Sequence, residues 1–274
     1  MHTFPCAKLN IGLNIVSRRD DGYHNLESVF YPIPLCDTLE IEEWEPADDP
    51  CQFRQIGFHV DADPSDNLVV KAFELMREEF GLPAIDIFLD KRIPMGAGLG
   101  GGSSDAAAMV SMLNEMFELN LSEAEMAARV SQLGADCAFF IYGKPQWVTG
   151  IGTQMAPIPF SLKGWKLLLV KPAVSVATAE AYRHVVPRRP ITDLREDVLL
   201  PVDSWRGRIK NDFEDSVFKQ FPEIEAIKKT LYDMGATYAS MSGSGSSVFG
   251  LFPYDVPETH CFDDCFTYKA ELLI

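Results

Sequence analysis

The segment from Pro94 to Ser104 carries the residue types in this sequence that point most directly to chemistry. It reads Pro-Met-Gly-Ala-Gly-Leu-Gly-Gly-Gly-Ser-Ser. Glycines permit positive φ angles and a close approach of the backbone, so successive N–H groups can form a nest for an anion. The segment runs into a predicted helix near Ser103, whose first N–H groups and dipole attract phosphate. It therefore predicts a loop that holds nucleotide phosphates, with Ser103 and Ser104 able to cap the helix or to offer hydroxyls to phosphate or Mg²⁺.

Two named nucleotide-binding motifs do not account for this loop. A Walker A loop ends in Gly-Lys-Ser/Thr, and no lysine lies here. A Rossmann pattern could be threaded through Gly96, Gly98 and Gly101, but that loop follows the first strand of its domain and needs an acidic residue about 20 positions later. A flexible surface loop is the remaining alternative. It is the weaker one, because mobile linkers rarely lie between a strand and a well-patterned helix.

A second loop rich in glycine and serine, from Ser242 to Ser247, is a weaker signal of the same kind. It reads Ser-Gly-Ser-Gly-Ser-Ser and lies between two short apolar runs. By itself it is explained as well by a turn between strands as by a ligand-binding loop. Both interpretations stay open at this point.

The first half of the chain predicts strands followed by helices. Apolar residues alternate over residues 6–16, and strands are also expected at 26–33, 38–44, 53–60 and 85–89. After the polar turn at 63–67, Leu68 to Phe80 has helical spacing and Gly81 is a natural stop. The stripe from Ala106 to Phe117 predicts the helix after the loop. Ser122 and Glu125 predict a capping box for the next helix.

The second half mixes strands and helices without strict alternation. Strands are expected at 145–152, 165–170, 238–241 and 247–252, and helices at 178–184, 213–218 and 223–234, with an irregular connection over 187–205. This arrangement predicts an α+β fold rather than a doubly wound sheet. We expect an N-terminal domain over residues 1–155 and a C-terminal domain over 156–274.

Composition and charge narrow the class of protein. The formal net charge is −16, whereas a nucleic-acid binder needs a basic surface to neutralise phosphates. No apolar run approaches the length that spans a membrane, and residues 1–5 lack the pattern of a secretion signal. We therefore expect a cytoplasmic protein whose six cysteines are buried and reduced.

Taken together, the motifs resemble the GHMP kinases, the family of galactokinase, homoserine kinase and mevalonate kinase. Pro94 to Ala106 is similar to their signature Pro-x-x-x-Gly-Leu-Gly-x-Ser-Ser-x-Ala, with one extra glycine. Further segments narrow the resemblance to the branch that acts on a cytidine-diphosphate-linked methylerythritol in the non-mevalonate isoprenoid pathway. They are Ala7-Lys8-Leu9-Asn10, Arg19-Asp20-Asp21-Gly22-Tyr23-His24, Asp66-Asn67-Leu68, Gly134-Ala135-Asp136 and Ser242-Gly243-Ser244-Gly245.

This sequence departs from the family pattern in two places. The usual Gly-Ala-Asp-Val-Pro reads Gly134-Ala135-Asp136-Cys137-Ala138, so the helix after Asp136 can begin differently. The segment 253–266 is also shorter than the corresponding segment of relatives, which usually contains a helix.

The resemblance implies a two-lobed ATP-dependent kinase, with an N-terminal nucleotide-binding lobe, a C-terminal substrate lobe and the active site between them. It implies transfer of the γ-phosphoryl group of ATP to the 2-hydroxyl of the methylerythritol moiety, with Mg²⁺ on the phosphates. Asp136 is the implied base, and Lys8 the cation that keeps Asp136 ionised and stabilises developing negative charge. Considered singly, a solvated strand-edge lysine for Lys8 and a helix cap for Asp136 are the favoured interpretations, and the joint match to the family motifs reverses that preference.

The resemblance also implies binding residues at both ends of the site. Tyr23 and Tyr182 are expected to sandwich the cytosine while His24 reads its edge, although Tyr23 could be a turn residue and Tyr182 a core aromatic. Asn10 and Thr178 are expected to hold substrate hydroxyls. The expected ATP contacts are Asn67, Leu68, Lys91, Pro94, Met95, Gly96, Ala97, Gly98, Leu99, Gly100, Gly101, Gly102, Ser103 and Ser104.

Three rival functions compete with this hypothesis. Another GHMP kinase, for homoserine or mevalonate, does not explain Asp21-Gly22-Tyr23-His24, because those substrates carry no base to stack. A non-catalytic ligand sensor on the same fold is expected to have lost Lys8 or Asp136, and both are present. A simple ATP-binding interaction module leaves the aromatic pair unexplained. The expected partner is therefore a small molecule with a cytidine diphosphate group, and neither nucleic acid nor membrane.

Overall fold

A computed structural model describes residues 1–45, 50–58 and 63–274. The chain divides into two compact units. Unit 1 comprises Met1–Ala7, Leu35–Met95 and Gly100–Lys144, and unit 2 comprises Lys8–Pro34, Gly96–Leu99 and Pro145–Ile274. The units interleave along the sequence, and the expected division into two domains at residue 155 stays a prediction. The interleaving arises because an N-terminal segment, Lys8–Pro34, forms its contacts with the C-terminal half.

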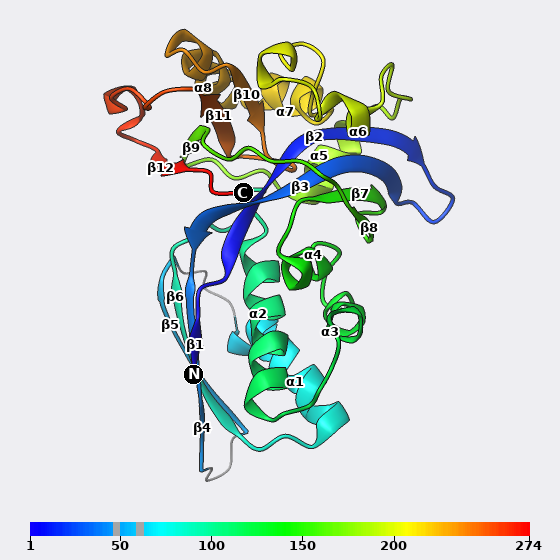
Figure 1. Ribbon diagram of the computed structural model, residues 1–274, viewed down its shortest axis with the longest axis vertical. Coiled ribbons are helices and arrows are strands. Elements are labelled where there is room, and N and C mark those ends of the chain that lie inside the picture. Colours follow the sequence, from blue (N-terminus) through cyan, green and yellow to red (C-terminus); the bar gives the residue numbers. More distant parts are fainter. Residues whose placement is uncertain (46–49, 59–62) are drawn as a thin grey trace. The chain divides into compact units, whose positions relative to one another are not determined.

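Unit 1 is a sheet covered by helices. The strand order is β1 (His2–Thr3), β4 (Thr38–Glu43), β6 (Ile85–Lys91) and β5 (Cys51–Gly57), with β4 antiparallel and β5 parallel to β6. Helices α1 (Leu68–Phe80) and α2 (Gly101–Met116) lie against the sheet in Figure 1. The core between them gathers buried side chains of the strands and both helices, among them Ile41, Ile87, Phe73, Met76, Val110 and Leu113.

Local signals explain where the helices of unit 1 begin and end. The side chain of Asn67 accepts a hydrogen bond from the N–H of Val69 and caps α1, which ends at Gly81 with φ of 65°. Helix α3 (Glu123–Val130) has the predicted capping box between Ser122 and Glu125. Helix α4 (Cys137–Tyr142) follows Asp136.

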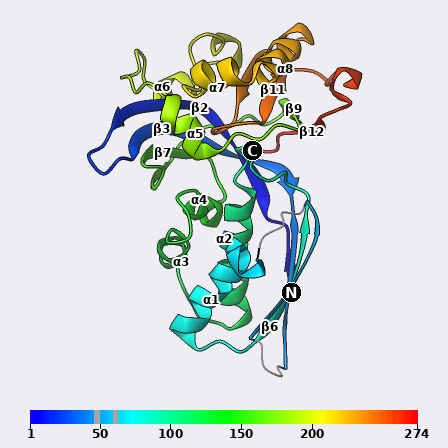
Figure 2. The ribbon, with the colours of Figure 1, turned by 180° about the vertical axis from the view of Figure 1, so that it is seen from behind.

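Unit 2 contains two sheets. The first has the order β2 (Cys6–Arg18), β3 (His24–Cys36), β7 (Gln146–Gly150) and β8 (Gln154–Pro157), and residues 6–7 of β2 and 35–36 of β3 belong to unit 1. The second is antiparallel, in the order β10 (Tyr238–Met241), β11 (Val248–Phe252), β9 (Lys166–Lys171) and β12 (Phe266–Glu271). Helices α5 (Thr178–His184), α6 (Leu194–Asp197), α7 (Glu214–Gln220) and α8 (Pro222–Asp233) accompany them. Figure 2 shows α8 beside β11, where its apolar face is buried through Ile224, Ile227 and Leu231.

The α+β class is confirmed, and the boundaries differ in places. The strand expected at 53–60 ends at Gly57, and Val60 lies outside the described residues. The helix after the glycine loop begins at Gly101, earlier than Ser103. The connection over 187–205 contains α6 and a 3₁₀ turn at Val202–Ser204, and β1, β8 and β12 were not predicted. The shortened segment 253–266 contains a 3₁₀ turn at His260–Phe262.

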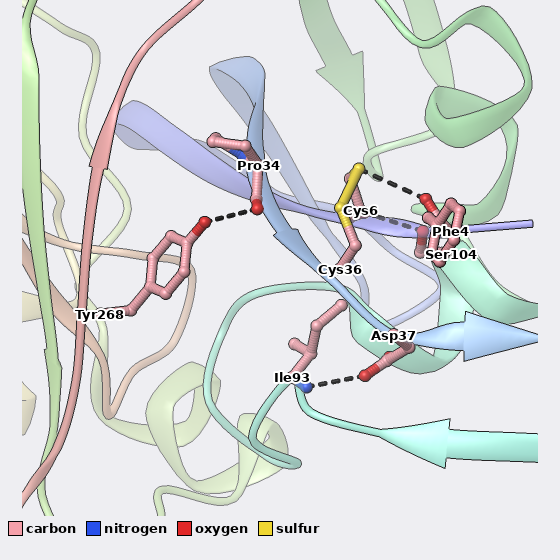
Figure 3. Close-up of a disulfide and its surroundings, with 8 residues drawn as sticks. All are labelled: Phe4, Cys6, Pro34, Cys36, Asp37, Ile93, Ser104 and Tyr268. Carbon is pink, nitrogen blue, oxygen red and sulfur yellow. Dashed lines mark hydrogen bonds between the residues drawn. A yellow bond between two sulfur atoms is a disulfide. The ribbon is translucent and has the colours of Figure 1, made fainter.

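The prediction that all cysteines are buried and reduced is wrong. Cys6 and Cys36 form a disulfide in unit 1 (Figure 3), and Cys261 is exposed. The two bonded residues are 30 positions apart in sequence, but β2 and β3 are neighbouring strands, which brings the start of one beside the end of the other. Over residues 1–45, 50–58 and 63–274, no helix combines the length and apolar character needed to cross a membrane.

Candidate active site

The glycine loop has the backbone that its sequence predicts. Gly96, Gly98 and Gly100 have φ angles of 59°, 74° and 71°, a region that residues with a Cβ rarely occupy. Gly100 is the N-cap of α2, and the N–H of Ser104 donates to its carbonyl oxygen at 2.9 Å. The N–H groups ahead of Ser104 are those that a helix leaves without an acceptor of its own. This end of α2 is therefore suited to bind phosphate oxygens.

Gly102 shows that the start of α2 is open to a ligand. A Cβ placed on Gly102 would meet only the side chain of Leu68, at an ordinary contact distance of 3.6 Å. Packing within unit 1 therefore does not require glycine at this position. Close approach of a phosphate group to the backbone would require it. The same contact places Leu68, one of the expected ATP residues, next to the start of α2.

Asp136 lies at the N-terminus of α4, close to the start of α2. A Cβ on Gly134 would be 3.8 Å from Oγ of Ser103 and 3.2 Å from Sγ of Cys137, so this turn lies against the end of the glycine loop. Asp136 occupies the N-cap position, but its side chain makes no capping hydrogen bond. A purely capping role therefore does not account for it. Next to it, burial raises the pKa of the Cys137 thiol to about 11, which leaves this thiol neutral and a poor nucleophile.

Lys8 in unit 2 is not a solvated lysine. Its side chain is 3% exposed, and its Nζ donates to Oδ1 of Asn10 at 2.6 Å and to the carbonyl oxygen of Gly98 at 3.2 Å. The ammonium also lies 4.6 Å from the ring centre of Phe30, in cation–π range. Nδ2 of Asn10 donates in turn to Oγ of Ser28 at 2.9 Å. The structure thus brings Lys8 and Asn10 together and directs the ammonium at the glycine loop.

The two glycine-rich loops meet in unit 2. Oγ of Ser242 donates to the carbonyl oxygen of Gly98 at 2.9 Å, and the N–H of Ser247 donates to that of Ala97 at 3.3 Å. A Cβ on Gly98 would lie 2.0 Å from the carbonyl oxygen of Ser242, so only glycine fits there. The second loop is thus a turn between the antiparallel strands β10 and β11 that packs on the first loop, and its role as a ligand-binding loop stays a prediction. Nδ2 of Asn211 anchors it by donating to the carbonyl oxygens of Met241 and Gly243, each at 2.8 Å.

Comparisons with known proteins agree with this geometry. Residues 67–144 match the family model of the GHMP kinases N terminal domain, and residues 202–259 match that of the GHMP kinases C terminal. The chain is 52% identical to the 4-diphosphocytidyl-2-C-methyl-D-erythritol kinase of Bacteroides thetaiotaomicron, over 99% of this chain and 100% of the relative. The chain belongs to the GHMP kinase family.

Solved structures give the same family. A crystal structure of 4-(cytidine 5'-diphospho)-2C-methyl-D-erythritol kinase matches this GHMP kinase with a TM-score of 0.76 and 33% identity, covering 92% of this chain and 90% of that one. The mevalonate kinase of Methanococcus jannaschii matches with a TM-score of 0.68 and 15% identity, over 100% and 98% of the two chains. The second likeness, at this identity, shows the shared fold alone.

The aromatic residues that we expect to bind cytosine in this GHMP kinase all lie in unit 2. The rings of His24 and Tyr182 stack in unit 2 with centroids 5.1 Å apart, and Tyr182 meets Phe213 edge-on at 4.9 Å. Tyr23 is 62% exposed, so nothing buries it as a structural aromatic. Burial, together with the charge of Arg18, lowers the pKa of His24, which favours the neutral ring at neutral pH. Oγ1 of Thr178 lies 3.1 Å from Oγ of Ser244 in the second loop.

Two expected nucleotide residues of the GHMP kinase have structural partners. Asn67 caps α1 and also donates from Nδ2 to Oε1 of Gln55 at 3.2 Å. Lys91 is buried, and its Nζ pairs with Asp37 and with Asp105. That geometry favours a supporting role for Lys91 over direct contact with nucleotide. Four further polar residues next to the candidate site residues were not predicted from the sequence: Ser28, Asp37, Asp105 and Asn211. Only Asp105, which directly follows the loop, carried a local signal.

Proposed function

We propose that this GHMP kinase transfers the γ-phosphoryl group of ATP to the 2-hydroxyl of 4-diphosphocytidyl-2-C-methyl-D-erythritol, in the cytoplasm. Relatives that are 51–52% identical over 99% of this chain are named 4-diphosphocytidyl-2-C-methyl-D-erythritol kinase. One observation supports the catalytic part above all. The Lys8 ammonium is buried, is held by Asn10, and is directed at the carbonyl oxygen of Gly98 in the phosphate loop.

The residues divide the work of phosphoryl transfer among them. This reaction depends mainly on positioning and on stabilising charge, because the protein takes part in little covalent chemistry. Asp136 orients the acceptor hydroxyl and accepts its proton, a role typically worth about 10²–10⁴-fold in rate. Lys8 stabilises negative charge as it develops, in a buried position where a cation acts more strongly than in water.

The nucleotide is assigned to the glycine loop and to α1. The open start of α2, where Gly102 tolerates a close ligand, fits triphosphate oxygens, and Asn67 and Leu68 border the adenine. Among the described residues, no cluster of three or more histidine, cysteine or acidic side chains forms a metal cage. Mg²⁺ commonly binds with the phosphates of its nucleotide and few protein ligands. The hydroxyl of Ser103 is the group that this loop would add.

The cytidine diphosphate end is assigned to unit 2. Tyr23 and Tyr182 provide stacking surfaces, and His24, favoured in its neutral form, can both donate and accept hydrogen bonds at the edge of a pyrimidine. Asn10 and Thr178 are assigned to substrate hydroxyls. A base entering next to Tyr182 must displace the His24 ring that stacks on it in the structure.

The deciding experiment is ATP-dependent phosphorylation of three acceptors in parallel: the cytidyl substrate, homoserine and mevalonate. Turnover of the cytidyl substrate alone, lost in Asp136→Ala, is the expected result. Near-full rate in Asp136→Ala would leave the substrate assignment standing and remove the role of Asp136. ATP binding without turnover of any acceptor would support a ligand sensor instead.

A further inference from the structure

Three ionisable side chains that the proposed chemistry does not use are buried together in unit 1. They are Asp37, which precedes β4, Lys91 at the end of β6, and Asp105 in α2, and none is more than 3% exposed. Nζ of Lys91 forms ion pairs with Oδ2 of Asp37 and with Oδ2 of Asp105, the latter at 2.8 Å. Burying charges is costly, and an apolar replacement is often as stable. Stability alone is therefore a weak explanation for this cluster.

The cluster is attached to the residues that lead into the glycine loop. Oδ1 of Asp37 accepts hydrogen bonds from the N–H of Arg92 at 2.5 Å and from that of Ile93 at 2.7 Å. Figure 3 shows the second of these bonds beside the disulfide. Pro94 follows at once. The backbone that enters the loop is thus fixed by the carboxylate that also holds Lys91.

The cluster is attached equally to the residues that leave the loop. Asp105 lies just after Ser104, so its pair with Lys91 ties the first turns of α2 to β6. A Cβ on Gly101 would lie 2.8 Å from Nζ of Lys91 and 2.9 Å from Cγ2 of Ile93, so the first residue of α2 packs directly on this ammonium. Oγ of Ser104 adds a bond to the carbonyl oxygen of Cys6 at 2.8 Å (Figure 3).

We propose that Lys91 and Asp105 are positioning residues for nucleotide binding, which clamp both ends of the phosphate loop to one buried ammonium. The proposal rests on the proposed ATP-dependent function. Phosphate binding by backbone N–H groups requires that those groups already point at the ligand, and small misplacements cost large factors. The ion pairs of Lys91 with Asp37 and Asp105 hold the N–H groups of the loop in that orientation without contacting the nucleotide.

The test measures the Kd of the full-length protein for Mg²⁺–adenylyl imidodiphosphate, a non-hydrolysable ATP analogue, by calorimetry. Asp105→Ala removes the tie to α2 but leaves Lys91 paired with Asp37, so no buried charge is left alone. We expect its Kd to rise about tenfold, and the KM for ATP to rise with it while the KM for the acceptor stays unchanged. Asp105→Asn keeps an oxygen that can accept from Lys91, and should stay within about threefold of the wild type.

Asp86→Ala is the matched control. Asp86 lies in the same unit on β6, pairs with Arg54 at 2.7 Å through Oδ2, and like Asp105 has a buried Oδ1 that accepts no hydrogen bond among the described residues. Equal Kd values for Asp105→Ala and Asp86→Ala would overturn the proposal. So would an Asp105→Asn protein as weak as Asp105→Ala. A wild type that does not bind the analogue would refute the ATP-dependent function as well.

Amide exchange of the wild type gives a second test that needs no variant. If both loop ends are clamped to one ammonium, the amides of Ile93 and Ser104 should open together, with protection within about tenfold of one another. Protection that differs by more than about a hundredfold would show that the two ends move independently, and would overturn the proposal even if Asp105→Ala did not fold.

Discussion

Lys8 and Asn10 point the same way from β2, and Nζ of the first donates to Oδ1 of the second at 2.6 Å. Alternate residues of a strand share one face, so this pair is set by the strand itself. Asn10 is fixed in turn because its backbone N–H donates to Oγ of Ser242 at 3.2 Å and its Nδ2 donates to Ser28. The ammonium is therefore held in place by the strand before any substrate binds.

Lys8→Met should lower kcat by roughly 10²–10³-fold while the KM for ATP changes little, because a preorganised cation acts mainly on the transition state. Methionine keeps an apolar stem beside Phe30, so the fold should persist. Steady-state kinetics on the cytidyl substrate measures the effect. Lys171→Met is the control, because Lys171 is also partly buried in unit 2 and donates to the carbonyl oxygen of Val174. A Lys8→Met rate within threefold of the control would refute the role.

Gly102→Ala should weaken ATP binding without lowering the stability of the fold. Gly102 lies in the first turn of α2, and an added Cβ would make only the ordinary contact with Leu68. Alanine in a helix is more favourable than glycine by about 0.5–1 kcal/mol, so urea unfolding should show an unchanged or slightly higher stability. The Kd for ATP should nevertheless rise tenfold or more if phosphate approaches this backbone. Unchanged ATP binding would place the phosphates elsewhere.

Tyr182→Ala should raise the KM for the cytidyl substrate about 5–150-fold, since stacking of a base on an aromatic ring is worth roughly 1–3 kcal/mol. The KM for ATP should not change. Tyr254→Ala removes a tyrosine that is 82% exposed in the same unit and serves as the control. If both variants behave alike, Tyr182 is only a packing partner of Phe213.

Asp105 should make the protein less stable as pH rises. Burial raises the pKa of its carboxyl to about 7, and the carboxylate of Asp37 acts in the same direction while the Lys91 ammonium opposes both. The folded state therefore holds a proton that the unfolded chain, with a pKa near 4, releases. The stability contributed by this group is complete below about pH 4 and is lost as pH rises through about 7.

Asp105→Asn removes this titration. Between pH 4 and pH 8, the free energy of unfolding of the variant should therefore rise relative to that of the wild type. Urea unfolding at both pH values measures this relative change in unfolding free energy, with Asp86→Asn as the control on β6. If the difference in unfolding free energy between Asp105→Asn and the wild type is the same at the two pH values, the assigned pKa is contradicted.

The cysteines should react with iodoacetamide in an order set by exposure and pKa. Cys261 is exposed and should be modified first, whereas Cys137 is buried with a pKa of about 11 and should be modified last. Cys6 and Cys36 should react only after reduction. Peptide mass spectrometry of the native protein gives the order, and modification of Cys6 without reductant would contradict the disulfide.

Much of unit 1 could be predicted because its signals are local. Asn67 and Gly81 bound α1, and Ser122 with Glu125 opens α3, through hydrogen bonds and φ angles that involve only neighbouring residues. The interleaving of the units had no such signal. It depends on Lys8–Pro34 packing with residues from Pro145 onward, which are far away in the sequence.

The sequence by itself determined the α+β class, the glycine loop that leads into α2 and the choice of Lys8 and Asp136 as candidates, because glycine conformations, helix caps and motif spacing are properties of short segments. Only the tertiary structure decided that Ser242 supports Gly98 from 144 positions away, and that Asp37 reaches Lys91 across 54. Such contacts depend on which strands become neighbours. That is a property of the whole core, and it brings buried charges and a glycine-serine turn into contact with the residues of the glycine loop and the start of α2.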